Sequence, residues 1–285
     1  MTYCVAMRLD AGLVFLSDSR TNAGVDHINT FRKMTVWERP GERMLVLMTS
    51  GNLSISQSVV NVLNEHLAAT DKPNLYNAPN LFEAARLVGD ALREVHQRDA
   101  AALKEFGVDF AAAFILGGHI HGEEPRLFQI YAAGNFIEAT HDTPYFQIGE
   151  SKYGKPIIDR VVKKATSLEE ASKCALISMD STIRSNLSVG LPLDLLVYER
   201  GDFKVTHQIK IGADDPYFNQ IRTQWGERLH QVFAELPDPA WDEGRERAGR
   251  QQKRRPRAPF AWAGKRLRAC SLPPPDRRRR TSRCP

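Results

Sequence analysis

Thr2, directly behind Met1, is the residue whose chemistry the sequence suggests first. A side chain as small as Thr permits removal of Met1, which would leave Thr2 with a free α-amine. A hydroxyl nucleophile and a base would then share one residue. The unperturbed α-amine has a pKa of about 7.7–8.0, so that near neutral pH a useful fraction can accept the hydroxyl proton, directly or through one water. Most Met-Thr starts carry no such chemistry, and this interpretation needs supporting residues.

Two charged residues could provide that support. The segment S-D-S-R-T at 17–21 closes an expected strand, and Lys33 stands just before another one. A hairpin that begins at residue 2 brings its return strand back beside the N-terminus. Asp18 and Lys33 would then place a cation near Thr2, which favours ionisation of the hydroxyl and keeps the amine neutral. Taken singly, either residue reads more simply as a surface charge.

A third feature is Thr49-Ser50-Gly51, where an expected strand opens into a helix. Backbone N–H groups at such a junction can stabilise an oxyanion. Gly51 has no side chain to keep a substrate carbonyl away. The alternative is an ordinary turn between a strand and a helix.

The elements that must position these residues follow from the hydrophobic pattern. Expected strands cover 3–9, 13–16, 34–38, 43–48, 110–116, 127–131, 136–138, 145–148, 194–198 and 203–211, and expected helices cover 55–67, 80–106, 151–165, 168–184 and 215–236. Asn80 and Ser167, each followed three residues later by Glu, resemble capping boxes. Strands and helices come in separate runs, which predicts an α+β fold of two packed antiparallel sheets with helix pairs on the outer faces.

Charge divides the chain of 285 residues into two parts. The net charge is +5, yet residues 242–285 hold 15 Lys and Arg against 4 Asp and Glu, which leaves an acidic body. We expect a hydrolase domain over 1–241 and a basic, Arg/Pro-rich, disordered tail over 242–285. Arg-rich segments bind phosphates non-specifically. However, the tail contains no recognisable nucleic-acid module, so nucleic acid is an unlikely partner.

Other classes of protein are excluded on simple grounds. No apolar run of 18 residues is present, and the N-terminus does not resemble a signal peptide. The four cysteines form no C-x-x-C pair, which favours a reducing compartment, the cytoplasm by default. We interpret His119, His121 and Glu123 as part of a solvated turn and Cys4 as a packed thiol. No metal and no cofactor are expected.

The motifs together resemble one known family. They are Thr directly after Met1, S-D-S-R-T at 17–21, F-R-K-M at 31–34, T-S-G-N-L-S at 49–54, F-Q-I-G-E-S-K-Y-G-K-P at 146–156, M-D-S-T-I-R-S-N-L-S-V-G at 179–190 and I-G-A-D-D-P-Y-F at 211–218. The chain resembles the β-subunits of the 20S proteasome and of the related bacterial two-component protease. The likeness is greatest to the bacterial Anbu (ancestral β-subunit) family and covers residues 2 to about 241.

This resemblance implies an N-terminal nucleophile hydrolase fold, a four-layer α-β-β-α sandwich, and a threonine peptidase. Thr2 would attack a peptide carbonyl, Asp18 would orient Lys33, Lys33 would tune the nucleophile, and the Gly51 amide would hold the oxyanion. Three further residues are the candidates for assisting the amine: Ser151, Asp180 and Ser185. The expected substrate-binding residues are Ser19, Arg20, Thr21, Asn22 and Thr49.

The resemblance also implies a homo-oligomer, a ring or an open-ring helical assembly, that acts on peptide or protein substrates. Two alternatives remain open. The same fold could act on a small or modified amide, or the chain could be a catalytically silent assembly or binding subunit.

Overall fold

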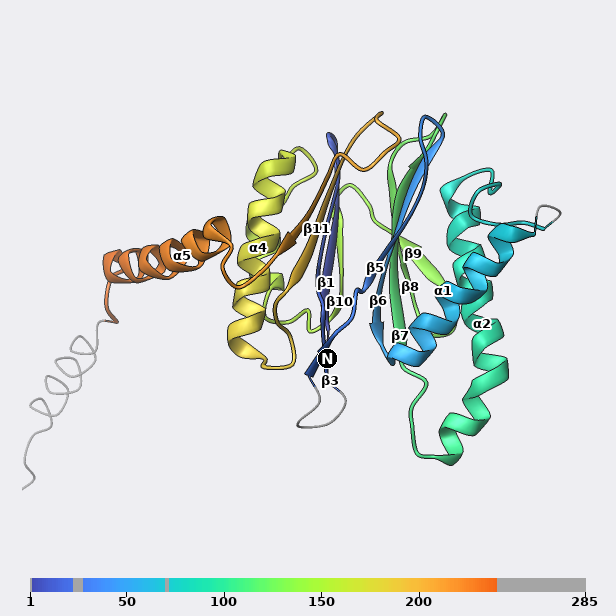
Figure 1. Cartoon of the computed structure of the whole chain (residues 1–285). Coiled ribbons are helices and arrows are strands. Elements are labelled where there is room, and N and C mark those ends of the chain that lie inside the picture. The colour runs from blue at the N-terminus through green and yellow to red at the C-terminus, as the bar shows by residue number, and fades with distance from the viewer. Residues whose placement is uncertain (1, 23–27, 70–71, 240–285) are drawn as a thin grey trace, which may run out of the picture. The chain divides into compact units, whose positions relative to one another are not determined.

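Two five-stranded antiparallel sheets lie face to face, with helices on both outer faces (Figure 1). The computed structural model describes residues 2–22, 28–69 and 72–239. The first sheet has the order β10 (Tyr145–Gly149), β1 (Tyr3–Leu9), β2 (Gly12–Asp18), β11 (Leu193–Glu199), β12 (His207–Ile211). The second has the order β5 (Met34–Arg39), β6 (Arg43–Gly51), β7 (Ala112–Ile120), β8 (Arg126–Ile130), β9 (Phe136–Glu138).

The helices complete four layers. Against the second sheet lie α1 (Leu53–Ala68) and α2 (Leu81–Glu105). On the first sheet lie α3 (Lys155–Val161) and α4 (Leu168–Ser185), and α5 (Pro216–Glu235) follows β12. The predicted α+β, four-layer α-β-β-α sandwich is therefore confirmed.

Alternation along the central strands builds the core. In β1, Tyr3, Val5 and Met7 pack on the helix side, whereas Cys4 and Ala6 face the second sheet. The strands β2, β6 and β7 divide their apolar residues between two sides in the same way. Because both faces of these strands are buried, their sequences read as continuous apolar runs. The predicted packed position of Cys4 is confirmed, since its side chain is buried.

Helix starts follow the predicted caps. Asn80 Oδ1 accepts a hydrogen bond from the Glu83 amide at 2.8 Å, and Ser167 Oγ accepts one from the Glu170 amide at 3.2 Å. Asp215 Oδ1 accepts from the Phe218 amide at 2.7 Å, so Asp215-Pro216 does open a helix. Each cap satisfies an amide that the first turn of the helix leaves without a partner.

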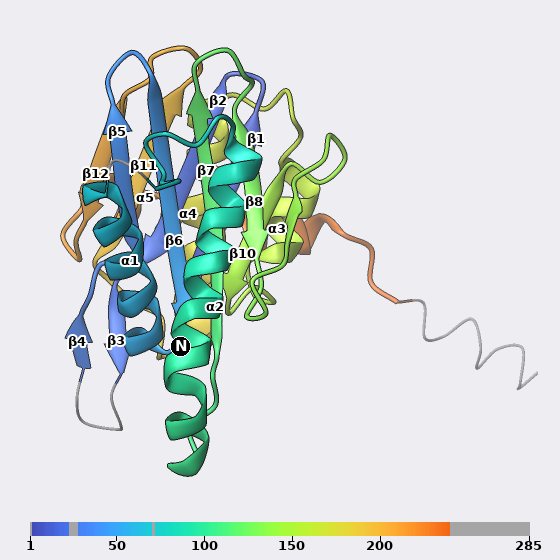
Figure 2. The same cartoon turned by 90° about the vertical axis from the view of Figure 1, so that its right-hand side faces the viewer.

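Three predicted elements differ in the structure. The helix expected from 151 begins only at Lys155, because residues 151–154 form turns and Pro156 stands at the helix start. The strand expected from 203 begins at His207, since Phe203 has a φ of 47° within a loop. A two-stranded ribbon of β3 (Arg20–Asn22) and β4 (Ile28–Thr30) was not predicted, and it lies at the end of the sandwich that holds the N-terminus (Figure 2).

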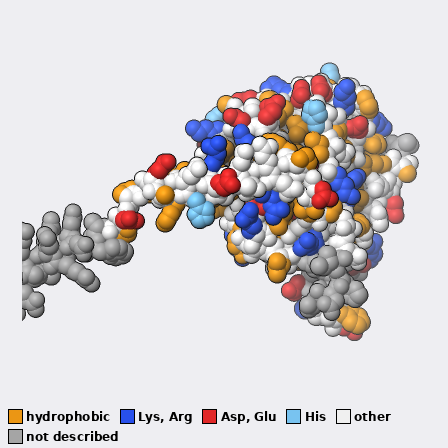
Figure 3. Space-filling model, turned by 60° about the vertical axis from the view of Figure 1, so that its left-hand side comes forward, with side chains coloured by type: hydrophobic (Ala, Val, Ile, Leu, Met, Phe, Trp, Pro, Cys, Tyr) orange, Lys and Arg blue, Asp and Glu red, His pale blue; other side chains and the backbone are white. Residues whose placement is uncertain are grey.

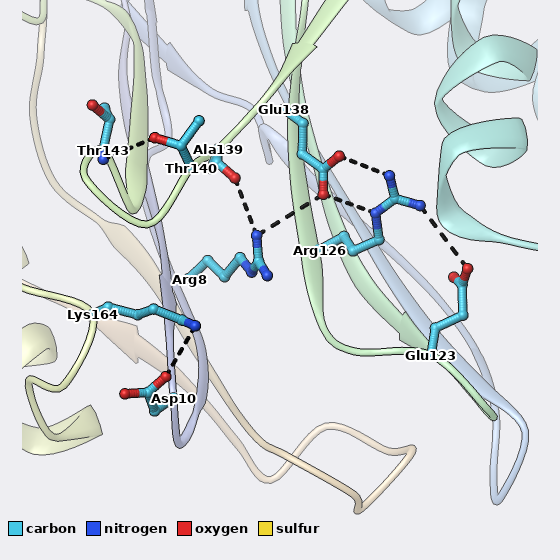
Figure 4. A network of polar contacts seen from close by, with 9 residues as sticks. All are labelled: Arg8, Asp10, Glu123, Arg126, Glu138, Ala139, Thr140, Thr143 and Lys164. Atoms are coloured by element: carbon cyan, nitrogen blue, oxygen red, sulfur yellow. Dashed lines mark hydrogen bonds and ion pairs between the residues drawn. The ribbon is translucent and has the colours of Figure 1, made fainter.

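A cluster of ion pairs joins the two sheets at the opposite end (Figure 4). Arg126 holds Glu138 through two hydrogen bonds of 2.8 and 2.7 Å. From β1, Arg8 donates to the Ala139 carbonyl at 3.1 Å and lies 3.9 Å from Glu138. Contacts between β1 and the β8–β9 hairpin therefore fix one sheet against the other.

One compact unit of the chain runs through Phe233, and a second begins at Ala234. The predicted boundary at 241 and the predicted tail 242–285 lie outside the described residues. None of the described helices is both long and apolar enough to cross a membrane.

Candidate functional site

Thr2 lies immediately before β1, held by the end of β10. Its carbonyl accepts a hydrogen bond of 2.7 Å from the Glu150 amide. Gly149 pairs with Tyr3 and has a φ of 81°, and a β-carbon there would stand 1.8 Å from the Thr2 carbonyl oxygen. Only glycine fits such an approach. The side chain of Thr2 is 7% exposed, and its hydroxyl makes no hydrogen bond to another described residue.

Asp18 and Lys33 meet beside Thr2. Lys33 Nζ donates to Asp18 Oδ1 at 2.8 Å, and the same oxygen accepts the Tyr3 amide at 3.0 Å. Lys33 Nζ also donates to the Arg20 carbonyl at 2.6 Å. Asp18 closes β2 and Lys33 precedes β5, so the pair connects the two sheets. The Tyr3 amide places the carboxylate one residue from Thr2.

Burial sets the electrostatics of this pair. Asp18 is 0% exposed and Lys33 is 5% exposed. Burial raises the pKa of the Asp18 carboxyl above its ordinary value, while the charge and hydrogen bond of Lys33 and the Tyr3 amide oppose that shift. An ion pair so withdrawn from water has a strong local field, because little solvent screens it.

Unsatisfied polar atoms gather at this same place. Among the described residues, the buried side-chain N and O atoms without a hydrogen-bond partner are Ser17 Oγ, Asp18 Oδ2, Arg20 Nε and Thr21 Oγ1. All four belong to the segment 17–21. A buried polar atom without a partner costs free energy, so such a cluster marks a functional site. The segment predicted to line the substrate cleft is also the one with unused hydrogen-bonding capacity.

A loop that sequence reasoning did not assign to the site covers this segment. Ser19 donates to the Pro192 carbonyl from its amide at 3.1 Å and from Oγ at 2.6 Å. Arg20 Nη1 donates to the Leu187 carbonyl at 2.8 Å. Gly190 lies so close to the Arg20 guanidinium that a β-carbon would be 2.3 Å from Cζ. The signal in the sequence was the glycine that ends the motif at 179–190.

Thr49 and Gly51 stand on the other side of Lys33. The Thr49 amide donates to the Lys33 carbonyl at 2.9 Å, and Cys4 Sγ lies 3.7 Å from the Thr49 carbonyl oxygen. Gly51 is the last residue of β6 and has a φ of 103°, two residues before α1 begins. The expected junction of strand and helix is confirmed at this point. A cavity of about 580 Å³ opens next to Thr49.

The three candidates for assisting the amine lie in different surroundings. Ser151 follows Glu150 in the turn beside the Thr2 carbonyl, and its amide donates to the Gly149 carbonyl at 2.9 Å. Asp180 is buried, and its two oxygens accept hydrogen bonds from Arg184 Nε at 2.9 Å and Arg222 Nε at 2.7 Å. Ser185 is the exposed last residue of α4.

The remaining substrate-lining residues belong to the ribbon. Arg20 and Thr21 pair with Thr30 and Asn29 across β3 and β4, and Asn22 ends β3. The structure thus brings Thr2, Asp18, Lys33, Ser19, Arg20, Thr21, Thr49 and Ser151 to one end of the sandwich.

His119 is not in a solvated turn, and this expectation was wrong. It is buried at the end of β7, where Nε2 donates to the Glu123 carbonyl at 2.7 Å and Nδ1 lies 2.5 Å from the Tyr198 hydroxyl. Desolvation lowers the pKa of His119, so the neutral ring is favoured. Within the described ranges, no group of three His, Cys, Asp or Glu side chains could hold a metal ion.

Known proteins similar to this chain are consistent in kind. A family profile described as proteasome subunit matches residues 2–195. Proteasome subunit beta 2 of Nitrosopumilus maritimus (strain SCM1) is 22% identical over 212 residues, which span 72% of this chain and 89% of that protein. The identity to solved Anbu structures is much higher.

Anbu (ancestral beta-subunit) from Yersinia bercovieri is 56% identical, with 84% of this chain and 100% of that chain covered and a TM-score of 0.80. The helical assembly of the Anbu complex from Pseudomonas aeruginosa is 52% identical, with 84% and 99% covered and a TM-score of 0.80. An Anbu (Gly-1) mutant from Hyphomicrobium sp. strain MC1 has the same identity and coverage, with a TM-score of 0.79. With its sandwich fold and with Thr2, Asp18 and Lys33 at one end of it, this chain belongs to the proteasome subunit family and, within it, to the Anbu ancestral β-subunits.

Proposed function

We propose that this chain is a threonine-type peptidase that uses Thr2 as its N-terminal nucleophile after removal of Met1. The observation that carries the proposal is the shared oxygen of Asp18, which binds Lys33 Nζ at 2.8 Å and the Tyr3 amide at 3.0 Å. This arrangement fixes a buried cation beside the residue that follows Thr2. Met1 lies outside the described residues, so its removal rests on the small size of Thr2.

In the proposed reaction, the Thr2 hydroxyl attacks a peptide carbonyl and its proton passes to the α-amine. The Lys33 ammonium lowers the free energy of the developing alkoxide, and Asp18 keeps that ammonium in place. The Gly51 amide would stabilise the oxyanion. Ser151, beside the Thr2 carbonyl, is the candidate of the three that is best placed to assist the amine. Water then hydrolyses the acyl-enzyme, which frees Thr2.

The substrate would bind in extended form along β3. Residues 20–22 are already extended and pair with β4 on one side. Backbone pairing of a peptide to such a strand is a common mode of recognition. The unpartnered Thr21 Oγ1 and Arg20 Nε supply hydrogen-bonding capacity at the same place.

We also infer that the active form is a homo-oligomer. The helix α5 carries Phe218 and Ile221 into the core, and its apolar stripe continues as Leu229, Val232 and Phe233, all of them exposed (Figure 3). A stripe that continues past its own core requires a second surface to cover it. The relative from Pseudomonas aeruginosa forms a helical assembly, so the occupant we propose is a second copy of this chain.

The test is the intact mass of the purified protein before and after exposure to a peptide epoxyketone, which cross-links a hydroxyl and a free amine on one residue. We expect loss of Met1 and one stoichiometric adduct, absent from Thr2→Ala and retained in Thr143→Ala at the other end of the sandwich. If Met1 is still present, the threonine mechanism is wrong. Loss of Met1 without an adduct favours a small-amide substrate or a silent subunit.

A further inference from the structure

The cavity beside Thr49 is enclosed by three elements that leave one side open. Its walls come from the edge strand β5, the edge strand β12 and α1, which lie on the same side of the molecule (Figure 2). Its volume is about 580 Å³. Its lining residues are Phe31, Arg32, Met34, Thr35, Val36, Thr49, Ser56, Gln57, Val60, Asn61 and Gln208. The Thr49 amide on the Lys33 carbonyl joins this cavity to the site of Thr2.

The charge of the lining is one-sided. Arg32 is the only charged residue among the cavity-lining residues described, and no carboxylate is among them. Gln57, Asn61 and Gln208 add amide groups that can donate hydrogen bonds. Such a lining suits a negatively charged or hydrogen-bond-accepting side chain, and it disfavours a cationic one.

Arg32 has hydrogen-bonding capacity left over. Its side chain is 62% exposed and makes no hydrogen bond to a described residue. Its nearest acidic partner is Asp194, with Nε 3.8 Å from Oδ2. A guanidinium has five N–H donors in a planar fork that matches a carboxylate. At this distance and exposure the pair neutralises Arg32 only in part.

Asp194 explains why Arg32 lies in the cavity. Its side chain on β11 is 7% exposed, and Arg32 supplies its one ion pair among the described residues. Lys33, the next residue, turns the other way toward Asp18. Adjacent side chains on extended backbone point to opposite sides, so one cation serves the nucleophile and the other faces the cavity.

We propose that this cavity binds an acidic side chain of the substrate, on the acyl side of the bond that is cleaved, and that Arg32 binds its carboxylate. This assignment rests on the peptidase function proposed above and names its substrate class: peptides with Glu at that position. Arg32 acts on specificity and takes no part in the bond-breaking step.

The test compares two epoxyketone peptides that differ only in Glu or Gln at the terminal residue, so that size is matched and charge is not. The readout is the rate of adduct formation by intact mass. In the unaltered protein we expect the Glu peptide to react about tenfold faster or more, the scale of one charge-assisted hydrogen bond. Arg32→Gln should remove this preference, and Arg32→Glu should favour a Lys peptide instead.

Arg39→Gln is the matched control, since Arg39 is an exposed cation on the same strand that pairs with Glu42. It should leave the Glu-to-Gln ratio unchanged. Equal rates for both peptides in the unaltered protein, or a ratio that survives in Arg32→Gln, would overturn the assignment. Melting curves of each variant check that Asp194 without its partner has not unfolded the chain.

A binding measurement separates this inference from the peptidase proposal. Fluorescent Glu and Gln peptides are titrated into the Thr2→Ala protein, in which no adduct can form. Tighter binding of the Glu peptide that is lost on Arg32→Gln supports the acidic pocket even if Thr2 proves unreactive. Equal binding of both peptides contradicts the pocket and leaves the proposed nucleophile untouched.

Discussion

Asp18 and Lys33 form an ion pair almost completely withdrawn from solvent, with Nζ 2.8 Å from Oδ1. It is both a load on folding and the proposed source of the field at Thr2. Removing one partner leaves an unpaired buried charge, which costs about 3–5 kcal/mol. We expect Asp18→Asn to lose about this much stability in denaturant unfolding, and epoxyketone adduct formation to slow by at least about a hundredfold.

The double variant Asp18→Asn/Lys33→Met serves as its control. With no lone charge left in the core, its unfolding free energy should recover most of the loss. Its adduct formation should stay low, because the cation is gone. Recovery of both properties would show that the pair is structural only.

Gly149 should be irreplaceable for a reason that Gly41 does not share. Both have positive φ, 81° and 78°, yet a β-carbon at Gly149 meets the Thr2 carbonyl oxygen at 1.8 Å, and one at Gly41 meets nothing within 4 Å. Gly41→Ala should cost about 1–2 kcal/mol of unfolding free energy from backbone strain alone. Gly149→Ala should cost more and displace Thr2, so only it should lose the adduct. Equal behaviour of the two variants would contradict this geometry.

His119 should make stability depend on pH. Its pKa in the folded protein is lowered from 6.5 by desolvation, so protons bind the unfolded chain more readily. The stabilisation is present above the unfolded pKa and is lost as pH falls through the folded pKa. The melting temperature should therefore fall on acidification below about pH 6.5, and by less in His119→Gln. An equal fall in both proteins would show that other groups govern the acid limb.

Asp180 should prove to be a positioning residue. Because Arg184 and Arg222 occupy both of its oxygens, Asp180→Asn should lower the unfolding free energy by about 1–3 kcal/mol. Adduct formation per folded molecule should remain, whereas Ser151→Ala should slow it. Loss of the adduct in Asp180→Asn at unchanged stability would instead assign Asp180 to the nucleophile.

The exposed stripe of α5 should control assembly. Val232→Asp places a charge among exposed apolar residues and should reduce the mass of the oligomer in light scattering after size exclusion. Gln231→Asp, on the neighbouring exposed position of the same helix, should leave that mass unchanged. If neither variant changes the mass, a different surface joins the copies.

Much of this protein is determined locally, by the sequence itself. Alternating and continuous apolar runs set the strands from Tyr3–Leu9 to Tyr145–Gly149, since both faces of these strands must be buried. Caps at Asn80 and Ser167 satisfy amides within three residues, which is why those helix starts were predictable. The residues Thr2, Asp18 and Lys33 could be named because their chemical types and their order along the chain form a recognisable set.

Other features were decided only by tertiary packing. The β3–β4 ribbon is short and has little hydrophobic pattern, so no local signal marks it. His119 is buried by Tyr198 and Phe203, which follow it by about 80 residues along the chain and reach it only when the sheets stack. The partners of Asp180 and Arg32 likewise come from elsewhere: Arg222 lies on α5, and Asp194 lies on β11. Charge pairing across such separations depends on distances that sequence spacing does not contain, and the folded chain alone supplies them.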